Sequence, residues 1–287
     1  MRCQLLAVDE RRQAPKGNIL HKTIRQKLIN GQVLLGLAHM YSDAGIIEGM
    51  GPGWDFTWID MQHGQHDFGS TLDAIRASEA TGLHTLVRVP GSDPDVISKV
   101  ADMDPDAVMV PMVNTADEAR AAVQALHFPP LGSRSFGGRR VIDRHGRNFY
   151  KDRDLVVVVQ IETLEALDCV DEIAAVEGVD LLFFGPDDMK LRMGLDLSMP
   201  VSENKQLCDA LRKVAEAAKE AGKHSGVVAV TPELVQLNVN YGYQFIVGGG
   251  DSMFLKSGAA DALRNLRAAA RGVDEGAAVN NQTLYGN

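Results

Sequence analysis

Short, largely apolar segments alternate with longer amphipathic ones along most of the chain. The apolar segments are too short to be free-standing helices, and such runs are typical of strands buried on both faces of a parallel sheet. Eight strands are predicted in this way, at residues 33–37, 56–60, 84–88, 107–112, 156–161, 180–184, 225–229 and 244–247.

The segments between these strands have helical spacing of their apolar residues. Helices are predicted at residues 70–81, 115–126, 164–176 and 204–221, and Gly82, Gly178 and Gly222 follow three of them, where glycine often ends a helix. Strand–helix alternation repeated eight times predicts an α/β fold, a parallel (β/α)8 TIM barrel. An open, doubly wound sheet is the alternative arrangement.

The whole chain, residues 1–287, is predicted to be a single barrel domain, because no linker separates two units. The barrel core is expected at about residues 18–271, with an N-terminal extension at 1–17 and a polar tail at 272–287. A hydrophobic content of 45% in 287 residues is ample for one such core.

Charge and cysteine usage narrow the possible partners. The net charge of −9 argues against nucleic acid, whose partners usually carry basic patches. No apolar run approaches the roughly 20 residues that a membrane span needs, and the N-terminal segment is a poor secretory signal. Three scattered cysteines, Cys3, Cys169 and Cys208, suggest neither a disulfide framework nor a zinc site, so a cytoplasmic location is expected.

Charged side chains stand at the ends of four predicted strands. The carboxyl ends of the strands form the active-site rim of a barrel, so these side chains are expected to gather at one site. They are Asp60 and His63 after the second strand, Arg88 at the end of the third, Glu162 after the fifth, and Asp187 and Asp188 after the sixth.

Glu162 and one of the two aspartates are candidate metal ligands. A buried strand that ends in an uncompensated carboxylate is costly unless a cation or hydrogen-bond donors meet it. Two hard oxygen ligands, with positions left for water and substrate, suit Mg²⁺ or Mn²⁺. Asp187 competes with Asp188 as the second ligand, and a structural ion pair with arginines of the 129–154 connection is the alternative.

Arg88 and His63 are candidates for substrate binding and proton transfer. The planar guanidinium of Arg88 suits a carboxylate or an enolate oxygen, although it could instead be a structural partner of Glu162 or Asp60. His63 has the proton affinity of a general base at neutral pH, and Asp60 could bind one ring nitrogen and fix the tautomer. His66 is expected to be an ordinary loop residue, and His39 is a weaker candidate.

Two connections are unusually long, at residues 129–154 and 186–206, and long loops in compact domains are often functional. The first carries five arginines: Arg134, Arg139, Arg140, Arg144 and Arg147. A phosphate site at residues 248–250 is disfavoured relative to a tight turn, because Asp251 follows at once and would repel a phosphate.

The residues at these strand ends resemble the HpcH/HpaI aldolases, a family of class II, metal-dependent pyruvate aldolases. The match runs in order from about residue 36 to residue 255, and the pairing of its last two motifs is the most specific part. The matching motifs are Asp60-Met61-Gln62-His63-Gly64, Arg88, Val110-Pro111-Met112, Gln160-Ile161-Glu162-Thr163 and Gly185-Pro186-Asp187-Asp188.

The resemblance implies a metal-dependent aldolase that reversibly cleaves a 4-hydroxy-2-oxo acid to pyruvate and an aldehyde through a metal-stabilised pyruvate enolate. It implies Mg²⁺ or Mn²⁺, with Co²⁺ or Zn²⁺ as further possibilities, and a homo-hexamer in which the last helix is exchanged between subunits. The roles that it implies are metal ligation by Glu162 and Asp188, catalysis by His63, Asp60, Arg88 and Asp102, and substrate binding by Arg88, Gln160, Gly185 and Asp187. Asp102 falls where the family places an acid that reaches a neighbouring subunit's site.

The chain departs from the family pattern at two places. Gln62 stands where many members have Glu, which should leave His63 less cationic because a nearby anion raises the pKa of histidine. The segment 135–147 differs from the usual loop and is expected to wall the aldehyde side of the site.

Two other functions stay open at this point. A citrate-lyase-like acyl-CoA lyase would use a similar metal site, and Arg134, Arg139 and Arg140 could then bind CoA beside the rim. A non-catalytic binder of keto acids is the third possibility. A Schiff-base aldolase is disfavoured, because the nearest lysine, Lys190, lies beyond the second acid in a polar loop.

Overall fold

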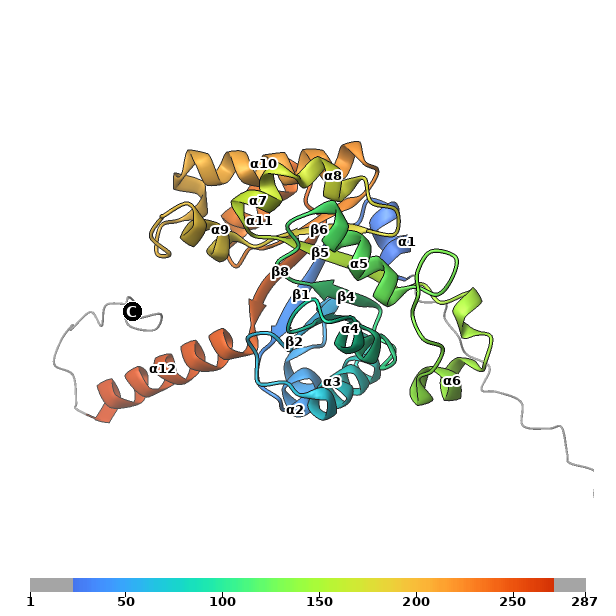
Figure 1. The fold of residues 1–287 in the computed structure, drawn as a ribbon. Helices are drawn as coiled ribbons and strands as arrows, with labels where there is room; N and C mark the ends of the chain where they lie inside the picture. Colours follow the sequence, from blue (N-terminus) through green and yellow to red (C-terminus); the bar gives the residue numbers. More distant parts are fainter. Residues whose placement is uncertain (1–22, 271–287) are drawn as a thin grey trace, which may run out of the picture.

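The computed structural model describes residues 23–270, which form a closed barrel of eight parallel strands (Figure 1). Each strand pairs with the next along the chain, and β8 pairs with β1. The predicted (β/α)8 barrel is confirmed, and the doubly wound alternative is wrong because the sheet has no free edge. The strands are β1 (Leu34–His39), β2 (Phe56–Asp60), β3 (His84–Arg88), β4 (Ala107–Val110), β5 (Val156–Ile161), β6 (Leu181–Phe184), β7 (His224–Val228) and β8 (Phe245–Gly250).

Helices connect the strands and cover the outside of the barrel. Most begin at an Asp, Asn or Thr whose side chain accepts a hydrogen bond from the first turn, such as Asp67, Thr115 and Thr163. The α-helices are α1 (Ile24–Ile29), α2 (Ala44–Met50), α3 (Phe68–Ala80), α4 (Pro94–Ala101), α5 (Ala116–Leu126), α6 (Arg139–His145), α7 (Leu164–Asp168), α8 (Val170–Ala174), α9 (Pro186–Arg192), α10 (Lys205–Glu220), α11 (Pro232–Tyr241) and α12 (Asp251–Ala270). Short 3₁₀ turns, η1 and η2, lie at Phe149–Lys151 and Val201–Glu203.

The helix predictions need three corrections. The helix expected at 164–176 is two short helices, α7 and α8, which meet at Cys169. The connection 186–206 begins with α9, and the connection 129–154 contains α6. The extension predicted at 1–17 and the tail at 272–287 lie outside the described residues.

Aromatic side chains fill the interior of the barrel. The rings of Phe56 and Phe245 stack with 3.8 Å between centroids. Gly36 makes room for them, because a Cβ at that position would lie 2.2 Å from the Phe56 ring. Nearer the carboxyl ends of the strands, the rings of Trp58 and Phe183 pack with their centroids 5.6 Å apart. The interior is therefore a packed core, and a site has to lie at the rim.

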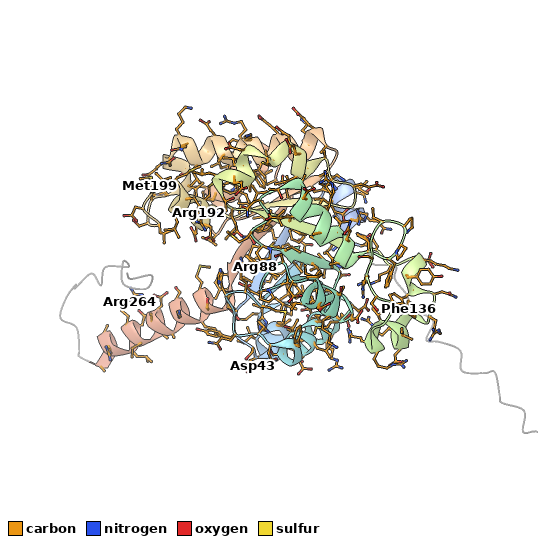
Figure 2. The ribbon with its side chains drawn as sticks, in the orientation of Figure 1. Asp43, Arg88, Phe136, Arg192, Met199 and Arg264 are labelled. Carbon is orange, nitrogen blue, oxygen red and sulfur yellow. The ribbon has the colours of Figure 1, made fainter. Side chains whose placement is uncertain are left out.

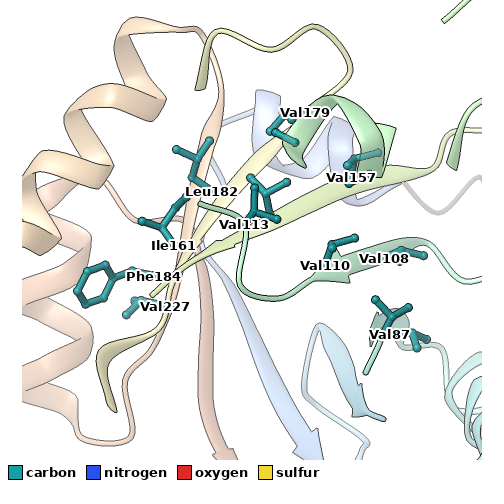
Figure 3. Packing of buried hydrophobic residues seen from close by; sticks show 14 of the residues in the cluster. Val87, Val108, Val110, Val113, Val157, Ile161, Val179, Leu182, Phe184 and Val227 are labelled. Atoms are coloured by element: carbon teal, nitrogen blue, oxygen red, sulfur yellow. The ribbon is translucent and has the colours of Figure 1, made fainter. Parts of the chain in front are cut away.

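A second hydrophobic layer lies between the strands and the surrounding helices. Val157, Ile161, Leu182 and Phe184 are fully buried in this layer, with side chains pointing outward from β5 and β6 (Figure 3). Because these residues alternate with the inward-facing ones, both faces of each strand are apolar, which explains why the strands read as nearly continuous apolar runs.

The final helix, α12, leaves the barrel and projects away from it (Figure 1). Leu255, Leu263 and Leu266 on this helix are 44%, 48% and 69% exposed. A long helix that buries so little of its apolar surface is consistent with the predicted exchange between subunits, which concerns partner chains and stays a prediction. Across residues 23–270, no helix combines the length and the apolar character that crossing a membrane requires.

Candidate active site

Strands β2, β3, β5 and β6 bring polar side chains together at the carboxyl-terminal rim of the barrel. Asp60 and Arg88 are direct partners in the register of β2 and β3. Glu162 follows β5, and Gly185 follows the neighbouring strand β6. The parallel sheet thus gathers residues that lie far apart in the sequence, as the strand-end pattern predicted.

Arg88 and Asp60 form a buried, two-pronged ion pair. Arg88 Nε donates to Asp60 Oδ1 at 2.9 Å and Nη2 donates to Oδ2 at 2.5 Å, and the two residues are 6% and 0% exposed. The remaining Nη1 donates to Gln160 Oε1 at 3.3 Å, and the guanidinium lies 4.7 Å above the Trp58 ring. Arg88 is therefore held rigidly over the aromatic core, with its charge partly matched by one carboxylate.

The predicted side-chain contact between Asp60 and His63 is not formed in the described structure. Asp60 instead accepts the two Arg88 hydrogen bonds and the backbone amides of Gln62 and His63, at 3.0 and 3.3 Å. The physical reason is that a buried carboxylate gains more from a guanidinium fork than from a neutral imidazole. The His63 side chain is exposed at the rim, and its role as the base stays a prediction.

Glu162 has a buried carboxylate with one unsatisfied oxygen. The residue is 1% exposed, Oε1 accepts the backbone N–H of Met112 at 2.8 Å, and Oε2 has no hydrogen-bond partner. Burial, opposed by the Met112 hydrogen bond and reinforced by the negative charge of Asp188, raises the pKa of Glu162 above its ordinary value. A buried oxygen of this kind fits a bound cation, which would supply the missing partner.

Gly185 packs closely against this oxygen. A Cβ at Gly185 would lie 2.7 Å from Glu162 Oε2 and 3.0 Å from Gln160 Nε2. Only glycine fits there, so the close packing of the turn between β6 and α9 against Glu162 and Gln160 depends on Gly185.

The structure also distinguishes the two candidate aspartates on α9. The Asp187 side chain is 76% exposed, and its Oδ1 lies 3.4 Å from Lys190 Nζ. Asp188 is partly buried, and its charge adds to the effect of burial in raising the pKa of Glu162. Asp188 is therefore better placed than Asp187 to share a cation with Glu162. Residues 23–270 contain no cluster of three or more His, Cys, Asp or Glu that could hold a metal, so a cation here would rely on two carboxylates, water and substrate.

This geometry predicts a pH-dependent metal affinity. Because burial raises the pKa of Glu162, a cation competes with a proton for this carboxylate, and the apparent affinity for Mn²⁺ should fall as pH drops through that raised pKa. The stability of the metal-free protein should change in the opposite sense. The contribution of Glu162 is fully present below its unfolded pKa of about 4.3 and is lost as pH rises through the folded pKa.

Calorimetric titration of Mn²⁺ between acidic and neutral pH tests this expectation. Affinity in the wild type should rise with pH and should be accompanied by proton release. The same pH dependence in Glu162→Gln would assign the proton to another group and contradict the prediction.

Sequence reasoning missed two contributors to the site. Met112 has a positive φ of 56°, rare for a residue with a side chain, and in this conformation its amide binds Glu162. Trp58, in the same strand as Asp60, forms the platform under Arg88. The alternation of inward-facing residues along β2 could have identified Trp58, and the Val110-Pro111-Met112 motif marked the position of Met112 without indicating what its backbone does.

Asp102 lies away from this rim in its own chain. It follows α4 and so lies at the opposite end of the barrel, where Arg134 Nη2 donates to its Oδ1 at 2.6 Å. Its predicted reach into a neighbouring subunit's site therefore stays a prediction.

The arginine-rich connection also lies at the far end of the barrel. It joins the end of α5 to the start of β5, and in Figure 2 Phe136 of this connection lies well apart from Arg88. Arg140 and Arg144 are paired with Glu79 at 2.6 and 2.5 Å. The expectation that this segment walls the site or offers a basic surface beside it is wrong within one chain, because the connection leads to the amino-terminal end of β5, away from the rim. Arg134, Arg139, Arg140 and Arg144 are in addition paired with carboxylates.

Comparisons with known proteins find related sequences and a similar fold. A family model described as HpcH/HpaI aldolase/citrate lyase matches residues 41–257. A 4-hydroxy-2-oxovalerate aldolase of Novosphingobium aromaticivorans is 36% identical, over 76% of this chain and 83% of its own length. A hydroxypyruvate/pyruvate aldolase of Rhizorhabdus wittichii is 35% identical, over 75% of this chain and 86% of its own. The crystal structure of an HpcH/HpaI aldolase/citrate lyase family protein from Burkholderia cenocepacia superposes with a TM-score of 0.77 at 29% identity, covering 85% of this chain and 98% of that one.

Proposed function

Since the chain belongs to the HpcH/HpaI aldolase/citrate lyase family and is an aldolase of that class, we propose that it reversibly cleaves a 4-hydroxy-2-oxo acid to pyruvate and an aldehyde. The observation that carries the proposal is the partnerless Glu162 Oε2, which lies at the rim within the electrostatic influence of Asp188 and Arg88. Glu162 and Asp188 would hold Mg²⁺ or Mn²⁺. When bound, such a cation supplies Lewis acidity to the 2-oxo group.

Arg88 stabilises the negative charge that develops on the substrate oxygen. Its guanidinium is fixed by Asp60 below and Gln160 beside it, so it does not need to reorganise during the reaction. Gln160 Nε2 lies beside Gly185 and offers a donor to the pyruvate half of the substrate. Backbone amides around Gly185 and Asp187 are the proposed binding site for the pyruvate carboxylate.

His63 is the proposed proton carrier. In the cleavage direction its imidazole accepts the proton of the 4-hydroxyl while the C3–C4 bond breaks and the aldehyde leaves. The enolate that remains takes this proton back from His63 at C3 and becomes pyruvate, which returns His63 to its starting state. The exposed position of His63 at the rim supports this role, because the base has to meet the part of the substrate that faces solvent.

A lysine-based mechanism has no support in this geometry. Lys190 is 6% exposed, and its amine donates to the Leu197 carbonyl at 3.0 Å and lies 3.4 Å from Asp187 Oδ1. A cation engaged in this way is a poor nucleophile for a carbonyl group.

Pyruvate alone tests the proposal. Wild-type protein with Mg²⁺ or Mn²⁺ should exchange the pyruvate methyl protons with deuterated water, as followed by NMR, and chelation should stop the exchange. A panel of aldehydes added to pyruvate should then identify the acceptor. Exchange that survives complete metal removal would contradict the metal-dependent mechanism, and cleavage of acyl-CoA thioesters without pyruvate exchange would favour the citrate-lyase-like alternative.

We also infer that the active assembly is a homo-oligomer, a hexamer by analogy with the family, in which α12 docks on a neighbouring chain. The exposed leucines of α12 and the distance of Asp102 from its own rim support this inference. In such an assembly a neighbouring chain's Asp102 is the proposed acid at the site.

A further inference from the structure

The first residue of α12, Asp251, is a fully buried carboxylate without a cationic partner at hydrogen-bond distance. It is 0% exposed and accepts the backbone N–H groups of Met40 at 3.0 Å, Tyr41 at 3.0 Å and Ser252 at 2.6 Å. The nearest basic group in the described chain, His39 Nε2, is 3.9 Å away and donates instead to the Asp43 carbonyl at 3.0 Å. Asp251 therefore joins the start of α12 to the turn that follows β1.

The turn that follows β1 also holds a second loop, residues 61–67, which carries His63 and is called the 61–67 loop. The Gln65 amide donates to the Met40 carbonyl at 2.7 Å, and His66 Nε2 bonds to the His39 carbonyl at 3.1 Å. Gly64 permits the close approach, because a Cβ there would lie 2.2 Å from the Asp60 carbonyl oxygen and 3.1 Å from that of Met40. The second half of the 61–67 loop is thus tied to the end of β1 and to the turn that follows it.

His66 contributes a hydrogen bond with a defined tautomer. Its partner is a carbonyl, which only accepts, so Nε2 carries the proton and Nδ1 is left without a partner. Burial, together with the nearby His39, lowers the pKa of His66 to about 4, so the ring is neutral at physiological pH. The rings of His39 and His66 pack with centroids 4.8 Å apart. An uncharged, buried imidazole of this kind is suited to fixing a loop rather than to exchanging protons.

We propose that Asp251 and His66 are positioning residues that hold the 61–67 loop, and with it His63, in the geometry that the reaction requires. The proposal rests on the proposed role of His63. Asp251 is also the first residue of α12. The same contacts therefore connect the start of α12 to the position of His63.

Four variants test the proposal. Asp251→Asn keeps the size of the side chain but presents an N–H₂ group to backbone N–H donors, and His66→Leu removes the hydrogen bond to His39. His66→Gln retains a nitrogen donor near the position of Nε2 and serves as the rescue variant. Asp261→Asn, an exposed substitution on the same helix, is the matched control.

The expected result for Asp251→Asn and His66→Leu is a fall in kcat of about 10–100-fold, since a small misplacement of a reacting group has effects of this size, with KM changed by less than about threefold. Backbone amides of residues 61–67 should exchange with deuterium faster, while β4, β5 and β6 keep their protection. His66→Gln and Asp261→Asn should behave like the wild type.

Unchanged exchange at residues 61–67 in both variants would overturn the proposal, and so would faster exchange with unchanged kcat. Loss of activity accompanied by unfolding of the whole barrel in Asp251→Asn leaves the decision to His66→Leu and its glutamine rescue. Failure of the wild type to exchange pyruvate protons would count against the proposed function alone, because deuterium exchange of the loop reports on its positioning without any substrate.

Discussion

Glu162→Gln is expected to lower kcat/KM by about 10³-fold or more. Lewis-acid stabilisation of developing charge is worth several kcal/mol, and each ~1.4 kcal/mol is a factor of ten in rate. Glutamine keeps the shape of the side chain and can still accept the Met112 amide, but it presents a neutral group where Glu162 Oε2 is without a partner. The variant therefore removes the ligand charge without removing the packing.

The same variant should separate activity from stability. Because burial raises the pKa of Glu162, its charged form is unfavourable in the metal-free protein at neutral pH, and Glu162→Gln should unfold at the same or a higher temperature. Added Mn²⁺ should stabilise the wild type, by about 2.7 kcal/mol at a concentration a hundredfold above its Kd, and should leave the variant unchanged.

Calorimetry with and without Mn²⁺, combined with the aldolase assay, measures both effects. Glu165→Gln, an exposed substitution three residues further along the chain, is the matched control and should retain activity and the response to metal. Stabilisation of Glu162→Gln by Mn²⁺ to the same extent as the wild type would place the metal elsewhere.

The fold could be predicted from the sequence because the strands are buried on both faces. In β5 and β6, Val157 and Leu182 pack against helices while Val158 and Leu181 fill the barrel, so both faces of these strands are apolar and the runs stand out in the sequence. The rim residues followed from the same pattern, since the carboxyl ends of parallel strands meet. Helix boundaries were less certain, and the break at Cys169 has no glycine or proline to signal it.

Pairing at the site was harder to predict than membership of the site. Asp60 and His63 are close in sequence, which suggested a dyad, but the alternative pairing of Arg88 with Asp60 is the one formed, because the two are direct neighbours in the register of β2 and β3. Register is a property of the folded sheet, and it places Arg88, a stronger hydrogen-bond donor than His63, beside the Asp60 carboxylate. His66 was likewise assigned to an ordinary loop. Its burial depends on contact with the end of β1, which the local sequence does not reveal.

Removal of either member of the Arg88–Asp60 pair is expected to destabilise the barrel by about 3–5 kcal/mol, since each single substitution leaves an uncompensated buried charge. Arg88→Met leaves Asp60 without its cation, and Asp60→Asn leaves Arg88 without its anion. Asn still accepts the amides of Gln62 and His63, so the loop contacts are retained. Urea unfolding of the metal-free proteins measures these changes, and Arg212→Met, which removes an exposed pair with Asp209, should change stability little.

Arg88→Met combined with Asp60→Asn decides between a structural and a catalytic reason for the pair. With both charges gone, no buried charge is left uncompensated, and the combined variant should be more stable than the sum of the single changes predicts, by about 0.5–3 kcal/mol. Its kcat/KM should nevertheless stay as low as that of Arg88→Met, because methionine has no donor for the substrate oxygen. Recovery of stability without recovery of activity would mean that the guanidinium of Arg88 is needed for the substrate oxygen on which charge develops. Asp60 would then be its buried counter-charge. Activity that returned together with stability would make the pair a structural element alone.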